Sequence, residues 1–406
     1  MWIRILSLIQ SIVTLVGCYI GSFLNLPNAR VQAFIEQNGG YIRGICHPNE
    51  NYDLLSDGGF NWVRFDIPYP YNADGTISGS YLAFKERCRA YTERGFRVMA
   101  ITPYPKSYIE IGGFNPIEPE NIEKTQQIAV FLLEDLRDVT GAFQVTNEMG
   151  VDTFTYPLTH EQAIEFIGVQ LEALDKVKGD FPIGYNSAGL AEWLHKGMRP
   201  YHQYCDYVGI DLYTGNTSTA TARDYTKRIS RVHRISGGLP IILEEFGFLS
   251  DGAPKTDAEK AAILAQYGYA SETQARADIE HFVQKLPEAF QTRLKESYDV
   301  SQWGDAVFET FENHFYRQIA QTGTYRGFAH TPEGQAQFYA DILPRLRKLN
   351  CLAGTILYCC QDSSVCWFCG LEGCPSETRW GIVDSQGVPK PAFEAVKACF
   401  RSPEFQ

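Results

Sequence analysis

Two acidic motifs and one arginine stand at the ends of apolar runs in this 406-residue chain, where core packing does not require charge. Asn147-Glu148 ends one such run, Glu244-Glu245 ends a second, and Arg64 lies near the end of a third. Two carboxylates that face one another can act as a general acid–base and a nucleophile. A cation beside one carboxylate keeps it ionised, whereas burial raises the pKa of the other, and Arg64 can supply that cation.

The elements that must position these residues follow from hydrophobic periodicity. Short apolar runs alternate with longer segments of helical period, which is typical of a parallel sheet with crossover helices. No Gly-rich phosphate motif follows the first run, which disfavours a dinucleotide-binding fold. The predicted strands are 41–46, 61–66, 96–102, 142–147, 181–186, 205–212, 239–245 and 353–358, and the main predicted helices are 81–94, 121–138, 159–178, 222–236, 331–349 and 389–400.

Eight strand–helix units over this length predict an α/β fold, a (β/α)8 TIM barrel, rather than an open sheet. In such a barrel the carboxyl ends of all strands face one shared site. We therefore expect the two acidic motifs and Arg64 to meet there. Two carboxylates brought from opposite sides of the barrel would flank a bound sugar, as retaining glycoside hydrolysis requires.

Two long segments interrupt the alternation. Residues 250–330 separate the seventh strand from its helix and carry helical patterns, and residues 359–385 follow the eighth strand and are rich in cysteine. Segments of this length usually have structure of their own. We expect a helical insertion after strand 7, with side chains such as Phe282 and Phe311 buried against the barrel mouth, and a Cys-rich loop after strand 8, all within one catalytic domain spanning 27–406.

Composition and charge exclude several classes of protein. Hydrophobic residues make up 44% of the chain and charged residues 21%, which is an ordinary globular composition and excludes disordered, collagen-like and coiled-coil proteins. The net charge is −12 and no Lys/Arg-rich run is present. We therefore expect no nucleic-acid partner.

The first residues resemble an export or anchor segment. Residues 1–26 carry one early positive charge, Arg4, and then a long uncharged apolar stretch. Within it, Leu15-Val16-Gly17-Cys18 resembles the bacterial lipobox, in which cleavage precedes a lipid-carrying cysteine. The alternatives are an uncleaved membrane span and a buried N-terminal helix. An export signal or a membrane span predicts an extracytoplasmic chain, secreted or held at the cell surface, whose only membrane contact is this segment.

The cysteines fit the same compartment. Setting Cys18 aside leaves ten, six of them between 359 and 399, and an even number suits disulfide pairing in an oxidising environment. Cys366-x-x-Cys369 followed by Cys374 could instead be a zinc knuckle. No histidine lies in 331–406, however, and the neighbouring thiols form no second spaced pair. The sequence therefore favours disulfides over a metal.

The chain resembles the retaining (β/α)8 glycoside hydrolases of clan A, the group that includes cellulases, β-mannanases and β-galactosidases. The resemblance covers about 40–250 and 331–400. That clan carries Asn-Glu at the end of the fourth strand and Glu at the end of the seventh, matched here by Asn147-Glu148 and by Glu245 in Glu-Phe-Gly. One departure concerns the eighth strand, where the clan commonly has Trp as a sugar platform and this chain reads Tyr358-Cys-Cys-Gln-Asp.

The resemblance implies a role for each matching residue. Glu148 would be the acid/base and Glu245 the nucleophile, preferred over Glu244 because alternation along a strand places the two on opposite sides. Asn147 would hydrogen-bond the 2-hydroxyl of the sugar, Arg64 would hold the nucleophile, and Tyr213 would support it from the sixth strand. No metal or cofactor is implied.

The expected function is that of a retaining β-glycoside hydrolase acting on β-linked oligo- or polysaccharides of the glucan or mannan type. An exo-acting β-galactosidase or β-glucuronidase is the closest alternative, favoured if the insertion closes the cleft into a pocket. A polyanionic substrate would ask for clustered Arg or Lys near the strand ends, and few are present. A non-catalytic surface carbohydrate-binding barrel is the alternative from another class, and retention of both glutamates and Arg64 argues against it.

Overall fold

The computed structural model describes residues 28–216, 218–252, 255–297, 304–316 and 323–406. The predicted export or anchor segment, residues 1–26 with its lipobox-like motif, lies outside the described residues. Within the described ranges, no helix is both long enough and apolar enough to cross a membrane.

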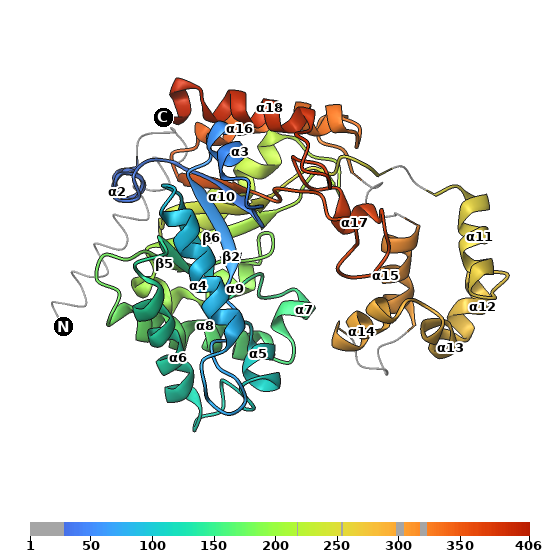
Figure 1. Ribbon diagram of the computed structural model, residues 1–406, viewed down its shortest axis with the longest axis horizontal. Helices are drawn as coiled ribbons and strands as arrows, with labels where there is room; N and C mark the ends of the chain where they lie inside the picture. The colour runs from blue at the N-terminus through green and yellow to red at the C-terminus, as the bar shows by residue number, and fades with distance from the viewer. Residues whose placement is uncertain (1–27, 217, 253–254, 298–303, 317–322) are drawn as a thin grey trace.

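Eight parallel strands close into a barrel, as predicted (Figure 1). Each strand pairs with the next along the chain, and the eighth returns to the first, with Ile42 opposite Gly354. The strands are β1 Ile42–Cys46, β2 Trp62–Asp66, β3 Arg97–Ile101, β4 Ala142–Val145, β5 Ile183–Tyr185, β6 Tyr207–Leu212, β7 Ile241–Phe246 and β8 Leu352–Leu357.

The six main helices that hydrophobic periodicity predicts around the barrel are present, with shorter helical turns between them. Local sequence sets their starts: Ser78 and Thr159 accept hydrogen bonds from the first-turn amides of the helices that follow them, and Pro stands in the first turn of α5, α16 and α18. These helices are α3 Tyr52–Asp57, α4 Gly79–Thr92, α5 Pro105–Glu110, α6 Ile122–Leu136, α7 Asp152–Thr155, α8 His160–Asp175, α9 Glu192–Gly197, the 3-10 turn η1 Arg199–Tyr204, α10 Ala222–Ile235, α16 Pro332–Arg347, α18 Pro391–Phe400 and the 3-10 turn η4 Pro403–Phe405.

The barrel has two apolar layers. The larger core lies between the outward side chains of the strands and the surrounding helices, and includes Val63 and Leu243. A smaller cluster lies inside the barrel, with Trp62 and Tyr207 among its members. Helix α2, Ala29–Gln37, adds its buried Phe34 to this inner cluster, 5.8 Å from the Tyr207 ring. The helix therefore helps to close the amino-terminal end of the barrel and leaves the carboxyl ends of the strands for the site.

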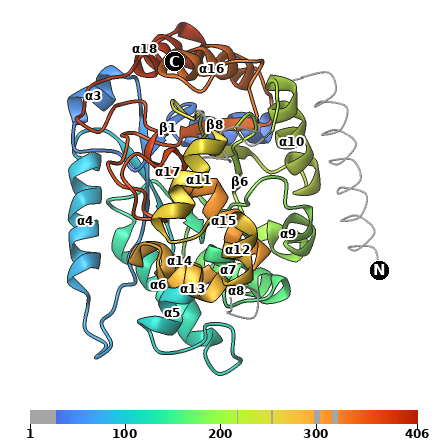
Figure 2. The ribbon, with the colours of Figure 1, turned by 90° about the vertical axis from the view of Figure 1, so that its right-hand side faces the viewer.

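In its described residues, the insertion after β7 forms five short helices, α11 Asp257–Gln266, α12 Glu272–Ala277, α13 Ile279–Gln284, α14 Glu288–Ser297 and α15 Asp305–Phe315. Figure 2 shows these helices in front of the barrel, and in Figure 1 they stand to one side of it, with α17, Pro375–Thr378, between. We refer to α11–α15 together with the Cys-rich loop 359–385 as the cap.

The cap has a hydrophobic core of its own. Phe282 and Phe311 pack 4.9 Å apart and belong to a cluster separate from both barrel layers. The expectation that these side chains would be buried against the barrel mouth is therefore wrong. They pack on one another because five short helices supply enough apolar faces to bury among themselves, and on Cys366, Cys369 and Cys374 of the loop.

The cysteines also depart from expectation. All ten cysteines in the described part of the chain are free thiols, so the predicted disulfides do not form in this structure. Most of these thiols are scattered through buried positions, as Cys88 in α4 and Cys205 before β6 illustrate, where a thiol behaves as a small apolar group. Only the three thiols of the loop between 366 and 374 gather around a histidine.

Candidate active site

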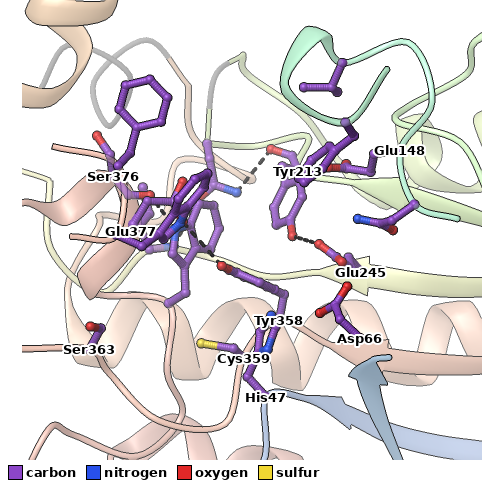
Figure 3. Close-up of a pocket in the computed structure, with 18 of the residues that line it drawn as sticks. His47, Asp66, Glu148, Tyr213, Glu245, Tyr358, Cys359, Ser363, Ser376 and Glu377 are labelled. Carbon is purple, nitrogen blue, oxygen red and sulfur yellow. Dashed lines mark hydrogen bonds between the residues drawn. The ribbon is translucent and has the colours of Figure 1, made fainter. Parts of the chain in front are cut away.

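The structure brings all five predicted site residues together at the carboxyl ends of the strands. Figure 3 labels three of them, Glu148, Tyr213 and Glu245. Arg64 from β2 donates to Glu245 Oε1 at 2.5 Å, and Tyr213, just after β6, donates its hydroxyl to Glu245 Oε2 at 2.5 Å. Arg64 and Glu245 are both buried. Both oxygens of Glu245 are therefore held, and a buried cation neutralises its charge.

Asn147 is fixed by three donors on one atom. Its Oδ1 accepts from Arg64 Nη2 at 2.6 Å, from Gln144 Nε2 at 3.0 Å and from Asn186 Nδ2 at 2.9 Å. With the carbonyl side of the amide saturated, Nδ2 is the atom left to donate to a ligand in the cavity that Asn147 lines. This geometry suits a donor to a sugar hydroxyl.

Glu148 occupies a backbone conformation that non-glycine residues seldom adopt. Its φ is 43°, and Thr146 two residues earlier has φ 54°. Hydrogen bonds hold both residues: the Glu148 amide donates to Asn186 Oδ1 at 2.8 Å, and the Thr146 amide donates to Thr102 Oγ1 at 2.9 Å. Each such conformation costs on the order of 1–3 kcal/mol, and non-glycine residues of this kind cluster at functional sites.

The environment of Glu148 makes it an acid at neutral pH. Burial, followed by the charge of Glu245, raises the pKa of its carboxyl to about 8, against a smaller opposing effect of Arg64. Oxygens of Glu148 and Glu245 lie within 4.8 Å of one another. A protonated carboxyl thus faces a carboxylate paired with arginine, which is the arrangement of an acid and a nucleophile.

Strand alternation does not hold at Glu244 and Glu245. The pairing of β7 shifts register on both sides: Ile210 faces Leu243, but the next residue, Asp211, faces Glu245. The extra residue is a β-bulge, which breaks the two-residue repeat. Glu244 packs its carboxyl against Gly209, where a Cβ atom would lie only 1.8 Å from Glu244 Oε2, and it does not line the cavity, whereas Glu245 does.

Sequence reasoning missed two buried residues beneath the carboxylates. Asn186, directly after β5, links Asn147 and Glu148 and also donates to Asp211 Oδ2 at 2.7 Å. Burial, with the charge of Glu245 second, raises the pKa of Asp211 well above its ordinary value. The rule that picked out Asn147, a polar residue ending an apolar run, applies equally to Asn186 and could have found it.

A cavity of about 850 Å³ lies over these residues, within the roughly 300–1,000 Å³ usual for ligand sites. Its floor is formed by strand-end residues such as Glu148 and Glu245, and one wall comes from the cap, with Thr310 and His314 of α15 and Trp367 of the loop. Among the described residues that line it, none is Lys or Arg.

Several aromatic residues surround the place where clan A enzymes commonly have a tryptophan after the eighth strand. Tyr358 follows β8 directly, and its ring lies 5.8 Å from that of Tyr213, while the Trp380 ring lies 5.0 Å from Tyr213. Trp367, 44% exposed, lines the cavity on the cap side. Glu377, which accepts from the Tyr358 hydroxyl at 3.3 Å, also lines it, and no pattern in the sequence marked that carboxylate.

Three carboxylates in the site, Glu148, Asp211 and Glu245, are close enough together to hold a metal ion. The guanidinium of Arg64 already pairs with Glu245 at 2.5 Å, and the raised pKa values of the other two favour their neutral forms. Because metal ligands must be deprotonated, this donor set suits proton transfer better than metal binding.

No protein-family model matches the chain, and no curated protein is significantly similar to it. Solved structures share the fold, and those we compared are all glycoside hydrolases. The GH53 catalytic domain of Ignisphaera aggregans superposes with a TM-score of 0.56 at 15% identity, over 88% of this chain and 95% of that one.

A family 39 glycoside hydrolase from Bacteroides cellulosilyticus WH2 gives a TM-score of 0.52 at 13% identity, over 88% of this chain and 62% of that one. A β-glucuronidase of Bacteroides uniformis superposes with a TM-score of 0.52 at 14% sequence identity, and the match covers 89% of this chain but only 35% of that one. At these identities the likeness establishes only the fold, a (β/α)8 barrel, as the sequence predicted.

Proposed function

We propose that the protein is a retaining β-glycoside hydrolase that acts by double displacement. The observation that carries the proposal is the pair of carboxylates on β7 and after β4, whose oxygens lie within 4.8 Å of one another. Retaining enzymes place their two carboxyl groups about 5–5.5 Å apart, whereas inverting enzymes leave about 6.5–9.5 Å for a water molecule. The short separation favours attack by Glu245 itself.

In the first step, a Glu245 oxygen bonds to the anomeric carbon while the glycosidic C–O bond breaks, and Glu148 gives its proton to the departing oxygen. With its pKa raised to about 8, Glu148 holds that proton at neutral pH. In the second step, Glu148 takes a proton from water, whose oxygen attacks the anomeric carbon and releases Glu245. Arg64 and Tyr213 hold Glu245 in line throughout.

The cavity favours an uncharged sugar. Its described lining holds no Lys or Arg, so the carboxylate of a uronic acid would be buried there without a cation to pair with. The β-glucuronidase alternative is therefore disfavoured. We propose a neutral β-linked substrate of the glucan, mannan or galactan type, and a preference for short chains because the cap walls one side of the cavity.

A panel of aryl β-glycosides tests the proposal directly. We expect hydrolysis of at least one neutral β-glycoside with retention at the anomeric carbon, followed by proton NMR. A 2-deoxy-2-fluoro aryl glycoside of the same sugar should label Glu245 covalently, as located by peptide mass spectrometry.

The matched control is Glu134→Ala, which removes an exposed carboxyl from α6 and should leave the rate and the labelling unchanged. A first product with inverted configuration, or a label on another residue, would overturn the mechanism. Carbohydrate binding without turnover of any glycoside in the panel would favour the non-catalytic alternative.

A further inference from the structure

Four potential metal ligands converge in the cap, outside the catalytic carboxylates. His314 Nδ1 lies 3.7 Å from Cys366 Sγ and 3.6 Å from Cys374 Sγ, and the ligand atoms of these residues and Cys369 all lie within 4.8 Å of one another. The three cysteines are buried. We propose that this cluster binds a structural zinc ion with a Cys3His ligand set.

The distances agree with a tetrahedral zinc site. Zinc binds thiolate sulfur at about 2.3 Å and imidazole nitrogen at about 2.0–2.1 Å, so tetrahedral angles place N and S about 3.6 Å apart and two S atoms about 3.8 Å apart. The two measured N–S separations match the first of these edges. Four N and S donors without an open position are typical of structural rather than catalytic zinc.

The loop is shaped to present its sulfurs. Cys366 and Cys369 flank a tight turn in which the Cys369 amide donates to Cys366 Sγ at 3.4 Å and the Gly370 amide donates to the Cys366 carbonyl at 2.9 Å. Gly370 takes φ +73°, which a residue with a side chain adopts only under strain. Amide donors to sulfur stabilise the thiolate form that a metal needs.

Neither disulfide bonding nor apolar packing explains why three thiols and one imidazole converge, whereas a bound metal does. Disulfides would join two sulfurs and leave the third over, and the structure leaves all three unpaired. Packing explains single buried thiols elsewhere in the chain, but it gives no reason for three thiols to meet the same imidazole nitrogen. The sequence favoured disulfides because no histidine lies in 331–406. The structure supplies the fourth ligand from His314 in α15, more than fifty residues before the cysteines.

The proposed ion would join the two halves of the cap beside the substrate cavity. His314 belongs to α15, and the three cysteines belong to the loop after β8. The Phe368 ring, between two of these cysteines in sequence, stacks on His314 at 4.6 Å, and both residues line the cavity. Zinc would thus hold the cap wall over the carboxylates without taking part in the chemistry.

Metal analysis of the full-length protein, purified without chelator from zinc-supplemented cells, tests the proposal independently of activity. We expect one equivalent of zinc per chain, and strong loss of it in His314→Ala and in Cys366→Ser. Cys399→Ser, which alters a thiol in α18 outside the cluster, should keep the full equivalent. A protein free of zinc, or variants that keep their zinc, would overturn the proposal.

Cobalt exchange decides the question on the unmodified chain, should the variants fail to fold. Co²⁺ in a tetrahedral Cys3His site gives intense visible d–d bands and a thiolate-to-metal band in the near ultraviolet, and we expect both. After chelation, three further thiols should become reactive to a thiol reagent. Absence of these bands, or a disulfide among the three cysteines in peptide mapping, would overturn the assignment.

Discussion

The barrel and the cap hold their functional residues in place by different means. In the barrel, buried hydrogen bonds of 2.5–2.6 Å run across the barrel mouth from Arg64 on β2 to Glu245 on β7 and to Asn147 after β4. In the cap, short helices and a loop share a small aromatic core, and their cavity-facing residues cluster around three thiols and a histidine. Under the proposed function, this difference would divide the roles: the barrel would carry the reaction and the cap would control access to the cavity.

The largest effect is expected at Glu245, the proposed nucleophile in the barrel. Glu245→Ala should lower kcat by roughly 10⁶-fold, the order found when a hydrolase loses its nucleophile. Added azide can occupy the vacated space, attack the anomeric carbon and give a glycosyl azide of inverted configuration, identified by NMR. An azide product of retained configuration would exchange the roles assigned to Glu245 and Glu148.

Glu148, the proposed acid/base, should show the next largest effect. Glu148→Gln should lower kcat/KM by roughly 10²–10⁴-fold for substrates with poor leaving groups and far less for activated aryl glycosides. In the unmodified enzyme kcat/KM should fall above about pH 8, because Glu148 must be protonated and its pKa is raised to about 8. The variant should lack this alkaline limb in a pH profile. An unchanged limb would show that another group carries the proton.

A cap residue should affect binding rather than chemistry. Trp367→Ala removes a ring from the cavity wall and should raise KM for an oligosaccharide about tenfold, which corresponds to about 1.4 kcal/mol. The kcat for an aryl monoglycoside should change little. Trp367→Phe keeps an aromatic face and should recover much of the affinity. Equal losses of kcat in both variants would place the cap within the reaction machinery and end the proposed division of roles.

The smallest effect on turnover is expected at Glu244, which is buried and does not line the cavity. Burial raises its pKa to about 8 in the folded chain, from an ordinary value of 4.5. Its contribution to stability is therefore complete below about pH 4.5 and is lost as the pH rises toward 8, because only the unfolded chain ionises freely in that window.

Glu244→Gln cannot ionise, so the free energy of unfolding should decline less between pH 5 and pH 7.5 than in the unmodified protein, by roughly 3 kcal/mol. Urea unfolding at the two pH values measures the difference, with Glu134→Gln as the exposed control. An identical pH dependence in all three proteins would show that Glu244 is not held protonated.

The sequence predicted the barrel well because its signals are local. All eight strands and the main helices lie at the predicted ranges, since apolar periodicity and helix caps act over a few residues. Asn147, Glu148 and Glu245 were found by the rule that strand ends meet in a closed parallel barrel. The rule needed no knowledge of distant contacts, because topology alone brings those positions together.

Local sequence patterns gave wrong or ambiguous predictions at two places, the end of β7 and the end of β5. The bulge in β7 breaks the alternation of side chains at Glu244 and Glu245. The residue pattern of this strand gives no sign of the bulge. An asparagine at a strand end, such as Asn186, fits a helix cap and a site residue equally well. Only its hydrogen bonds to Asn147, Glu148 and Asp211 distinguish the two roles.

The amino-acid sequence alone thus determines the architecture and the two carboxylates at its mouth, because short-range periodicity and parallel closure are sufficient to place them. Tertiary structure decides what surrounds them: the pKa of Glu148, the wall that Trp367 and Glu377 add to the cavity, and the meeting of His314 with three cysteines. These features depend on burial and on contacts between segments far apart in the chain, and the free energies that select such contacts have no signature in local spacing.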